Sequence, residues 1–218
     1  LEKEIEFGAI ARRMDVTNRS DIDVVVKEAI ADQGRIDLMV ANAGYGNFSS
    51  VEETSPEEVR RIFEVNVFGT LAVTQAVVKG MATRGSGRII IVSSIAGVAV
   101  APTFGPYAMT KHALQAMGKA MRAELAPAGI DVTLINPGPY NTGFNDRMAA
   151  SMWEWFGAGA ISAPATDLLL AIGTMVTTNQ LDPVDVANKL VELVEAETTQ
   201  ESNFMPPEIR DLIKAQLG

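Results

Sequence analysis

Residues 88–94 read Arg-Ile-Ile-Ile-Val-Ser-Ser. Four branched apolar side chains follow one another here, without the alternation of apolar and polar residues that marks a strand with one face in solvent. This is typical of a strand that is buried on both faces of a parallel sheet. The stretch therefore predicts a strand over Arg88–Val92 with helices on either side. Ser93 and Ser94 follow at its carboxyl end, where ligands bind in such sheets.

The same alternation of short apolar strands and helices extends outward from this stretch. It predicts β-α-β units and one Rossmann-like α/β domain over residues 1–218, with a doubly wound parallel sheet in three α/β/α layers. Further strands are expected at Ala9–Val16, Asp37–Val40, Ile130–Ile135 and Asn203–Met205. Helices are expected at 20–33, 55–83, around Tyr107 to near Pro127, at 182–197 and from Pro207, with a helix end over Leu1–Phe7.

Ser55-Pro56-Glu57-Glu58 marks a strong helix start, because Ser55 can cap the helix, Pro56 fits its first position and Glu58 completes a capping box. This helix carries Asn66 among apolar neighbours. A buried amide needs hydrogen-bond partners. Asn66 is either a satisfied core amide or a water-holding residue at a site, with Gly69 allowing close helix packing.

Composition excludes several classes of protein. The chain has 218 residues, no cysteine, one histidine (His112) and a net charge of −9. Thiol chemistry and disulfides are excluded, a histidine-rich metal site is disfavoured, and an acidic surface disfavours nucleic acid. The longest apolar stretches, such as Leu168–Val176, are too short to span a bilayer, and the first residues are not a signal peptide. We expect a soluble, cytoplasmic protein with no membrane span.

Tyr107-Ala-Met-Thr-Lys111 places a phenol and an ammonium on one face of a helix, because residues four apart are neighbours there. A nearby positive charge favours phenolate, so Lys111 is expected to lower the pKa of Tyr107. A tyrosine tuned in this way can exchange protons near neutral pH. The alternative is a surface helix with an unrelated tyrosine and lysine.

Other polar residues follow the predicted strands. Asp15, Asn42, Ser94 and the stretch 136–138 each come directly after one. The Ser94 hydroxyl can donate to a substrate oxygen and stabilise developing charge. The alternative for Ser94 is a loop serine that satisfies the backbone.

Together these residues resemble the short-chain dehydrogenase/reductase family over essentially the whole chain. The motifs that carry the resemblance are Asp15-Val16, Asn42-Ala43-Gly44, Asn66, Ser94, Tyr107-x-x-x-Lys111 and Pro137-Gly138 through Thr142. Tyr45-Gly46 and the stretch 52–74 look most like members of hydroxysteroid, retinol and ketoacyl type.

The resemblance implies an NAD(P)-dependent oxidoreductase that interconverts an alcohol and a ketone or aldehyde. Tyr107 would be the general acid or base, and Lys111 would lower its pKa and hold the nicotinamide ribose. Ser94 would hold the substrate oxygen, and Asn66 would anchor a water on a proton path from Lys111. No metal is implied.

The resemblance also implies a cofactor site for NAD or NADP, without choosing between them. Asp15 and Val16 would flank the adenine, and residues 42–44 (Asn42, Ala43 and Gly44) would lie along the adenosine ribose. Pro137, Gly138 and Thr142 would surround the nicotinamide. Tyr140 stands where the family usually has valine or isoleucine and would contact the carboxamide through its backbone.

Residues 139–180 differ in composition from the rest of the chain, because methionines and aromatic residues cluster there among small residues. This segment is expected to form a substrate lid. Met148, Met152, Trp153, Trp155 and Phe156 suggest an apolar, adaptable cover for an apolar carbonyl or alcohol substrate. The alternative is that these side chains pack a subunit interface or the core.

No glycine-rich phosphate turn precedes Asp15. We therefore expect an upstream segment of roughly forty residues in the natural protein, by ordinary β-α-β lengths. Without it, the strand at Asp37–Val40 would expose an edge and the strand at Ala9–Val16 would lose its neighbour. A competing hypothesis is a catalytically silent dinucleotide-binding or regulatory protein of the same fold. An epimerase is disfavoured, because only 111 residues follow Tyr107.

Relatives pair into dimers and tetramers through the helices that correspond to those at Ser55 and Tyr107. The resemblance therefore implies a homodimer or homotetramer. Val73, Val77, Val78, Met117 and Met121 are compatible with such an interface and equally with an internal core.

Overall fold

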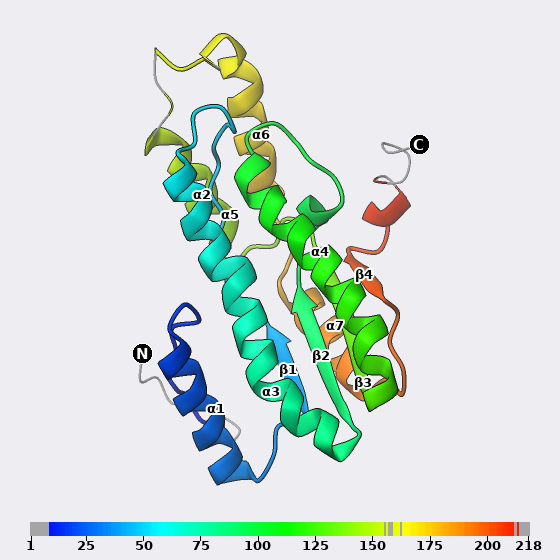
Figure 1. The fold of residues 1–218 in the computed structure, drawn as a ribbon. Coiled ribbons are helices and arrows are strands. Elements are labelled where there is room, and N and C mark those ends of the chain that lie inside the picture. Colours follow the sequence, from blue (N-terminus) through cyan, green and yellow to red (C-terminus); the bar gives the residue numbers. More distant parts are fainter. Residues whose placement is uncertain (1–8, 155, 157–158, 162, 212, 214–218) are drawn as a thin grey trace.

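The computed structural model describes residues 9–154, 156, 159–161, 163–211 and 213. Four strands form a parallel sheet in the order β1-β2-β3-β4 (Figure 1). Their bounds are β1 Leu38–Ala41, β2 Gly87–Val92, β3 Ile130–Pro137 and β4 Ser202–Met205. The expected strands at these four places and the α/β fold class are confirmed.

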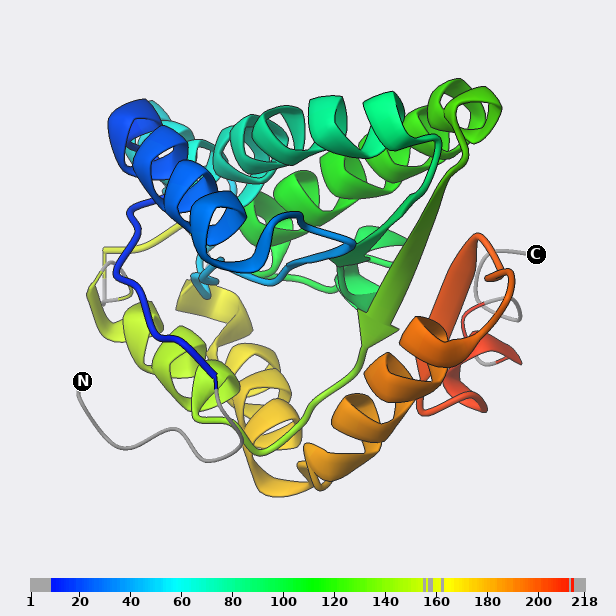
Figure 2. The same ribbon diagram turned by 90° about the horizontal axis from the view of Figure 1, so that it is seen from below.

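Helices cover both faces of the sheet, in three layers. Figure 2 shows α1 (Arg19–Gln33), α3 (Thr70–Arg84) and α4 (Gly105–Leu125) on one side and α7 (Val184–Glu195) on the other. Alternate side chains of β2 serve the two layers: Ile89 and Ile91 pack toward α3 and α4, while Ile90 packs toward α7. A strand between two helical layers needs apolar side chains on both faces, which accounts for the continuous apolar run in β2.

The long helix from Ser55 is continuous but not uniformly α-helical. It runs as α2 (Pro56–Phe63), a π-helical segment η2 (Glu64–Gly69) and then α3. The Ser55 hydroxyl accepts from the Glu58 N–H at 3.2 Å, as the helix-start motif predicts. π-Helical insertions are rare and frequently occur at functional sites. Here the insertion carries Asn66.

By length and composition alone, the helix of 29 residues from Pro56 to Arg84 could cross a membrane. This is weak evidence, since the core helix of a water-soluble protein passes the same test. Ile62, Thr74 and Met81 are fully buried against the rest of the protein. The absence of a membrane span stays a prediction.

The strand expected at Ala9–Val16 does not form. Residues 9–15 have no regular structure in the described part of the chain, and residues 16–17 form a turn. A strand exists only by hydrogen bonding to a neighbour, and β1 pairs only with β2 among the described residues. β1 is therefore an edge strand, and Val40 is 39% exposed. The helix end expected over Leu1–Phe7 lies outside the described residues.

The segment expected to be a lid is helical and irregular. It holds α5 (Phe144–Ala150), η5 (Ser151–Glu154), η6 (Ala163–Ala165) and α6 (Thr166–Thr178). Figure 1 shows α2, α5 and α6 gathered beyond the carboxyl ends of the strands. Short 3-10 turns η3 (Ile95–Gly97) and η4 (Ala126–Ala128) flank α4. The last helix expected from Pro207 falls largely outside the described residues, although 209–211 are helical.

Candidate functional site

The carboxyl ends of the strands bring the predicted site residues to one edge of the sheet. Ala41 of β1 is level with Ile91 of β2, and Val92 is level with Ile135 of β3. Residues 42–44, Ser94 and the end of β3 at Pro137 therefore lie side by side at this edge of the sheet. This edge is where parallel sheets bind ligands.

Tyr107 and Lys111 lie on the buried face of α4. Tyr107 is 6% exposed and Lys111 is 7% exposed. The Lys111 ammonium lies 5.6 Å from the centroid of the Tyr107 ring and donates to the Val92 carbonyl at 2.9 Å. The expected Tyr-Lys pair is therefore present, with the ammonium anchored at the end of β2.

The charge state of this pair differs from the sequence expectation. Burial raises the pKa of Tyr107 to about 12, and the hydrogen bond with Ser94 only partly opposes this rise. Burial lowers the pKa of Lys111 to about 8. The pKa of Tyr107 is therefore raised, and not lowered as the sequence predicts, because desolvation outweighs the opposing effect of Ser94.

Ser94 joins β2 to the loop that precedes α4. Its hydroxyl accepts from the Ala96 N–H at 3.1 Å, which caps η3, and lies 3.5 Å from the Pro137 carbonyl oxygen. The same hydroxyl acts to lower the pKa of Tyr107, against the larger effect of burial. Ser94 thus satisfies the backbone, which is the alternative to its predicted role. Its donation to a substrate oxygen stays a prediction.

Asn66 uses its side-chain amide within the protein. Its oxygen accepts from the Tyr45 N–H at 3.0 Å, and its nitrogen donates to the Tyr45 carbonyl at 2.8 Å and to the Thr110 hydroxyl at 3.1 Å. A Cβ on Gly44 would lie only 2.9 Å from the Asn66 oxygen. Asn66 therefore fixes the turn after β1 against α4. The predicted water path is untested, and the side chain is the satisfied core amide of the alternative.

Two residues at the site were not singled out from the sequence. Thr110 is fully buried, accepts from Asn66 and donates to the Tyr107 carbonyl at 2.7 Å. The Phe144 ring lies with its centroid 5.8 Å from that of Tyr107. Thr110 could have been found, because it lies three residues after Tyr107 on the same helix face. Phe144 could not, since α5 reaches the site only through the tertiary fold.

Asp15 and Val16 lie in the turn that leads into α1. The exposed Asp15 carboxylate accepts from the Thr17 N–H at 2.8 Å and from the Thr17 hydroxyl at 2.7 Å, and these bonds lower the pKa of Asp15. Val16 packs against η2, where a Cβ on Gly69 would lie 2.7 Å from Val16 Cγ2. Gly69 thus allows a close approach of this turn, in place of the close helix packing that was expected, and it holds the turn beside the helix of Asn66.

The residues after β3 separate into two groups. Gly138 continues the sheet by donating its N–H to the Met205 carbonyl at 2.7 Å, whereas Thr142 is exposed and its hydroxyl accepts from the Phe144 N–H at 3.3 Å. The Tyr140 side chain turns inward and packs with Ile135 and Leu193. Its ring therefore lies among core residues, as its departure from the family pattern suggests.

The lid segment packs on the same cluster as Tyr107. Met148, Met152 and Leu169 are buried there with Phe48, while Trp153 is exposed. Phe156 packs at the edge of this cluster, and Trp155 lies outside the described residues. The segment covers Tyr107 with apolar side chains, and its role as a lid stays a prediction.

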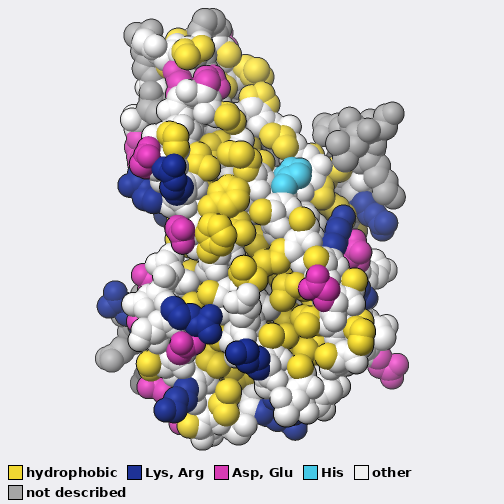
Figure 3. Space-filling model, in the orientation of Figure 1, with side chains coloured by type: hydrophobic (Ala, Val, Ile, Leu, Met, Phe, Trp, Pro, Cys, Tyr) yellow, Lys and Arg dark blue, Asp and Glu magenta, His cyan; other side chains and the backbone are white. Residues whose placement is uncertain are grey.

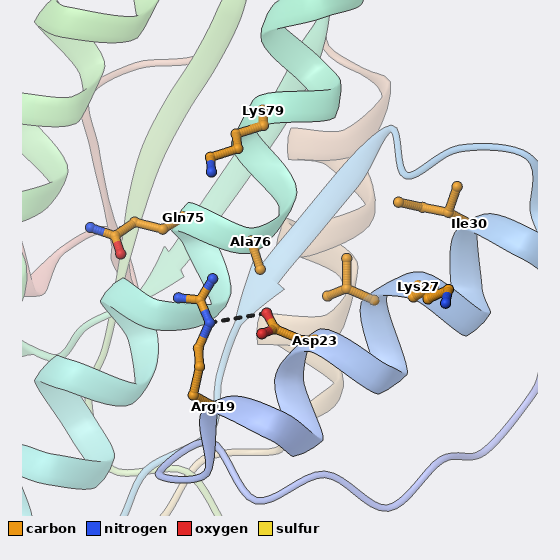
Figure 4. A pocket seen from close by; sticks show the side chains of 8 residues that line it. Arg19, Asp23, Lys27, Ile30, Gln75, Ala76 and Lys79 are labelled. Atoms are coloured by element: carbon orange, nitrogen blue, oxygen red, sulfur yellow. Dashed lines mark hydrogen bonds and ion pairs between the residues drawn. The ribbon is translucent and has the colours of Figure 1, made fainter.

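Two surface hollows lie elsewhere. A groove of about 340 Å³ runs between α1 and α3, and Figure 4 shows Arg19, paired with Asp23, facing Gln75 and Lys79. A second hollow of about 520 Å³ lies between α7 and β4 and includes Tyr140. Neither is lined by Tyr107, Lys111 or Ser94.

A family model described as short chain dehydrogenase matches residues 1–153. The chain therefore belongs to the short-chain dehydrogenase family. An uncharacterized oxidoreductase of Bacillus subtilis, YusZ, is 39% identical over 156 residues, which cover 71% of this chain and 52% of the relative. The chain spans about half the length of the curated relatives it matches.

Solved structures give the same family. A short-chain dehydrogenase from Streptomyces avermitilis superposes with a TM-score of 0.79 at 29% identity, covering 94% of this chain and 73% of the other. A gluconate 5-dehydrogenase from Burkholderia cenocepacia, solved with NADP and tartrate, has a TM-score of 0.59 at 33% identity, covering 64% and 56%. An NAD+-bound xylitol dehydrogenase has a TM-score of 0.72 at 26% identity, covering 88% and 75%.

Proposed function

We propose that the protein is an NAD(P)-dependent oxidoreductase that interconverts an alcohol and a ketone or aldehyde. The observation that carries the proposal is the meeting of Tyr107, Lys111 and Ser94 at the carboxyl edge of the sheet. Lys111 is hydrogen-bonded to the end of β2, and the Ser94 hydroxyl acts to lower the pKa of the phenol. Relatives that are named oxidoreductases or dehydrogenases support the same reaction class.

The residues at this edge fit a nicotinamide cofactor. Asn42, Ala43 and Gly44 are exposed at the end of β1, where a dinucleotide can approach the backbone. Asp15 and Val16 would flank the adenine, and Lys111 offers an ammonium for the nicotinamide ribose at the other end of the site. The cofactor, NAD or NADP, would accept or supply the hydride.

The protein's own groups would handle the substrate oxygen. Ser94 and Tyr107 hold this oxygen from two sides, so its developing charge is stabilised by two hydroxyl donors. The pKa of Tyr107, raised to about 12, keeps the phenol protonated at neutral pH, ready to donate to a carbonyl oxygen. The apolar lid side chains keep bulk water away from this oxygen. These features suit Tyr107 to act as the proton donor when a carbonyl is reduced.

The test is Tyr107→Phe, measured for nicotinamide-dependent turnover over a panel of ketones and aldehydes. Turnover should fall by at least about 100-fold, the usual contribution of general acid-base catalysis. Tyr45→Phe is the matched control, because it removes another phenol at the edge of the same core cluster and should retain activity. Equal turnover in Tyr107→Phe and wild type would refute the mechanism.

A catalytically silent dinucleotide-binding protein remains the second candidate. Such a protein would bind NAD or NADP, seen as cofactor-dependent thermal stabilisation, and would turn over no carbonyl. Measuring binding and turnover on one preparation separates the two candidates.

We also propose that the protein forms a homodimer or homotetramer through the face of α3 and α4. Val73, Val78, Met117 and Met121 pack partly into the core, and Val77 is buried in it. An apolar band on this face is visible in Figure 3, and Phe68 and Met109 are 51% and 39% exposed. Sedimentation that shows only monomer at micromolar concentration would contradict the proposal. The cytoplasmic location stays a prediction.

A further inference from the structure

Two polar side chains under the lid segment lack partners. Both side-chain atoms of the Asn47 amide and the Ser49 hydroxyl are buried without a hydrogen bond among the described residues. Asn47 is 6% exposed and Ser49 is 4% exposed. Buried polar groups in proteins are nearly always hydrogen-bonded, so three such atoms within three residues require an explanation.

These residues lie between the lid and the loop that leads to Tyr107. A Cβ on Gly46 would lie 2.6 Å from Met148 Sδ in α5. The Phe48 N–H donates to the Ser151 hydroxyl at 2.8 Å, and the Ser49 N–H donates to the Thr103 carbonyl at 2.8 Å. The backbone of this segment is therefore fixed on both sides, while the side chains of Asn47 and Ser49 are not.

The same lid residues cover Tyr107. Phe48, Met148 and Leu169 share a buried cluster with the Tyr107 ring, and Phe144 contacts that ring from α5. Because Tyr107 is 6% exposed, a substrate that reaches its phenol would displace part of this cover. That displacement also uncovers the segment from Gly46 to Ser49, because α5 packs on it. The substrate would then lie against both groups of residues.

We propose that Asn47 and Ser49 bind a second oxygen-bearing group of the substrate, while Tyr107 and Ser94 hold the reacting oxygen. The inference rests on the proposed oxidoreductase function. An amide and a hydroxyl each donate and accept, and neither carries a charge, so the group they fit is a neutral hydroxyl, carbonyl or amide. The substrate is then a largely apolar ketone or alcohol with one further neutral polar group.

The test uses a pair of substrates: a hydroxyketone, and the ketone in which that hydroxyl is replaced by hydrogen. Ser49→Ala is the first variant, because it removes an unpartnered hydroxyl with little change in shape. Asn47→Ala is the second. Each should lower kcat/KM for the hydroxyketone by about tenfold and leave kcat/KM for the plain ketone within about twofold, as loss of one or two neutral hydrogen bonds implies.

Ser50→Ala is the matched control. Ser50 is buried in the same loop, but its hydroxyl donates to Glu53 at 3.1 Å. Ser50→Ala should change kcat/KM for the two substrates by the same factor. An equal fall on both substrates in Ser49→Ala and Asn47→Ala would overturn the inference, since that result indicates a packing role.

Stability gives a readout that does not depend on turnover. If both side chains lack partners in the free protein, Ser49→Ala should leave the melting temperature unchanged or raise it. A clear fall would mean that buried water already satisfies Ser49, and would count against the inference. In Tyr107→Phe, the hydroxyketone should raise the melting temperature more than the plain ketone does. Equal shifts would overturn the inference, whereas absence of turnover in wild type would refute only the proposed function.

Discussion

The Asn66 side-chain nitrogen donates to the Thr110 hydroxyl at 3.1 Å and thereby joins the π-helical segment to the helix of Tyr107. The two residues are 44 positions apart in sequence, and Thr110 in turn donates to the Tyr107 carbonyl. The turn after β1, the long helix and α4 are therefore held together at one buried point. This link fixes the first turns of α4 relative to the strand ends.

Thr110→Val removes the hydroxyl that Asn66 needs and keeps the side-chain shape. It leaves one donor of Asn66 buried without a partner, so the free energy of unfolding should fall by about 1–3 kcal/mol. Urea denaturation measures this. Thr74→Val is the control, because Thr74 is equally buried but donates only to the Thr70 carbonyl within its own helix. A loss as large in Thr74→Val would show that Asn66 is not involved.

The pH dependence of stability should reflect both shifted groups. Between pH 8 and 10.5, Lys111 holds its proton in the unfolded chain but not in the folded one, so the free energy of unfolding should rise with pH. The pKa difference corresponds to on the order of 3 kcal/mol. Between pH 10 and 12, folded Tyr107 keeps a proton that the unfolded chain loses, so the free energy should fall.

Denaturation over pH 7–12 measures both effects. Lys111→Met should flatten the rise above pH 8, and Tyr107→Phe should weaken the fall above pH 10. Lys79→Met, at an exposed position on α3, should leave the profile as in wild type. A rise that persists in Lys111→Met would contradict the assignment.

Gly129→Ala should be among the most destabilising single substitutions. Gly129 has φ +72°, and a Cβ there would lie 2.0 Å from the Gly85 carbonyl oxygen. Backbone strain and the clash together should lower the free energy of unfolding by more than about 3 kcal/mol. Gly34→Ala is the matched control, since Gly34 has φ +81° but no atom within 4 Å of its Cβ position. It should cost about 1–2 kcal/mol, the strain alone; similar losses at both sites would mean that the loop moves to avoid the clash.

Asp131→Ala should destabilise the end of the sheet opposite the site. Its carboxylate accepts from Arg88 at 3.1 Å, from Arg122 at 2.8 Å and from the Thr199 hydroxyl at 3.0 Å. Its removal leaves two partly buried guanidinium groups with one partner fewer. The free energy of unfolding should therefore fall by about 2–3 kcal/mol. Asp37→Ala breaks the exposed pair with Arg35 and should cost less than about 1 kcal/mol. Comparable costs in urea denaturation would show that burial adds nothing to this cluster.

Local signals in the sequence account for the elements that were predicted correctly. The helix expected at 20–33 ends at the predicted place because Gly34 caps its C-terminus. The helix at Ser55 begins at the predicted place because Ser55 caps its N-terminus. Strand β2 is also predicted correctly. Burial on both faces gives it a continuous apolar run, which can be recognised from the strand's own residues. The strand expected at Ala9–Val16 failed for the opposite reason: a strand depends on its neighbour, which no local pattern supplies.

The candidate site likewise has one part that local sequence patterns predict and another part that only the tertiary structure shows. The spacing of Tyr107 and Lys111 predicts a shared helix face, and Ser94 is predicted at a strand end. The partners of Asn66 and the contact of Phe144 with Tyr107 join segments that are tens of residues apart. Periodicity within one segment carries no information about which distant segment will face it.

The sequence alone determined the alternation of strands and helices, and the positions of Tyr107, Lys111 and Ser94 on elements whose ends meet. The tertiary structure decided how deeply these groups are buried, and therefore that the pKa of Tyr107 rises and that of Lys111 falls. It also decided that Met148 and Ser151 pack against Gly46 and Phe48, beside the unpartnered side chains of Asn47 and Ser49. Burial is the sum of contacts from many segments, so the protonation of the site is a property of the folded chain and not of its motif.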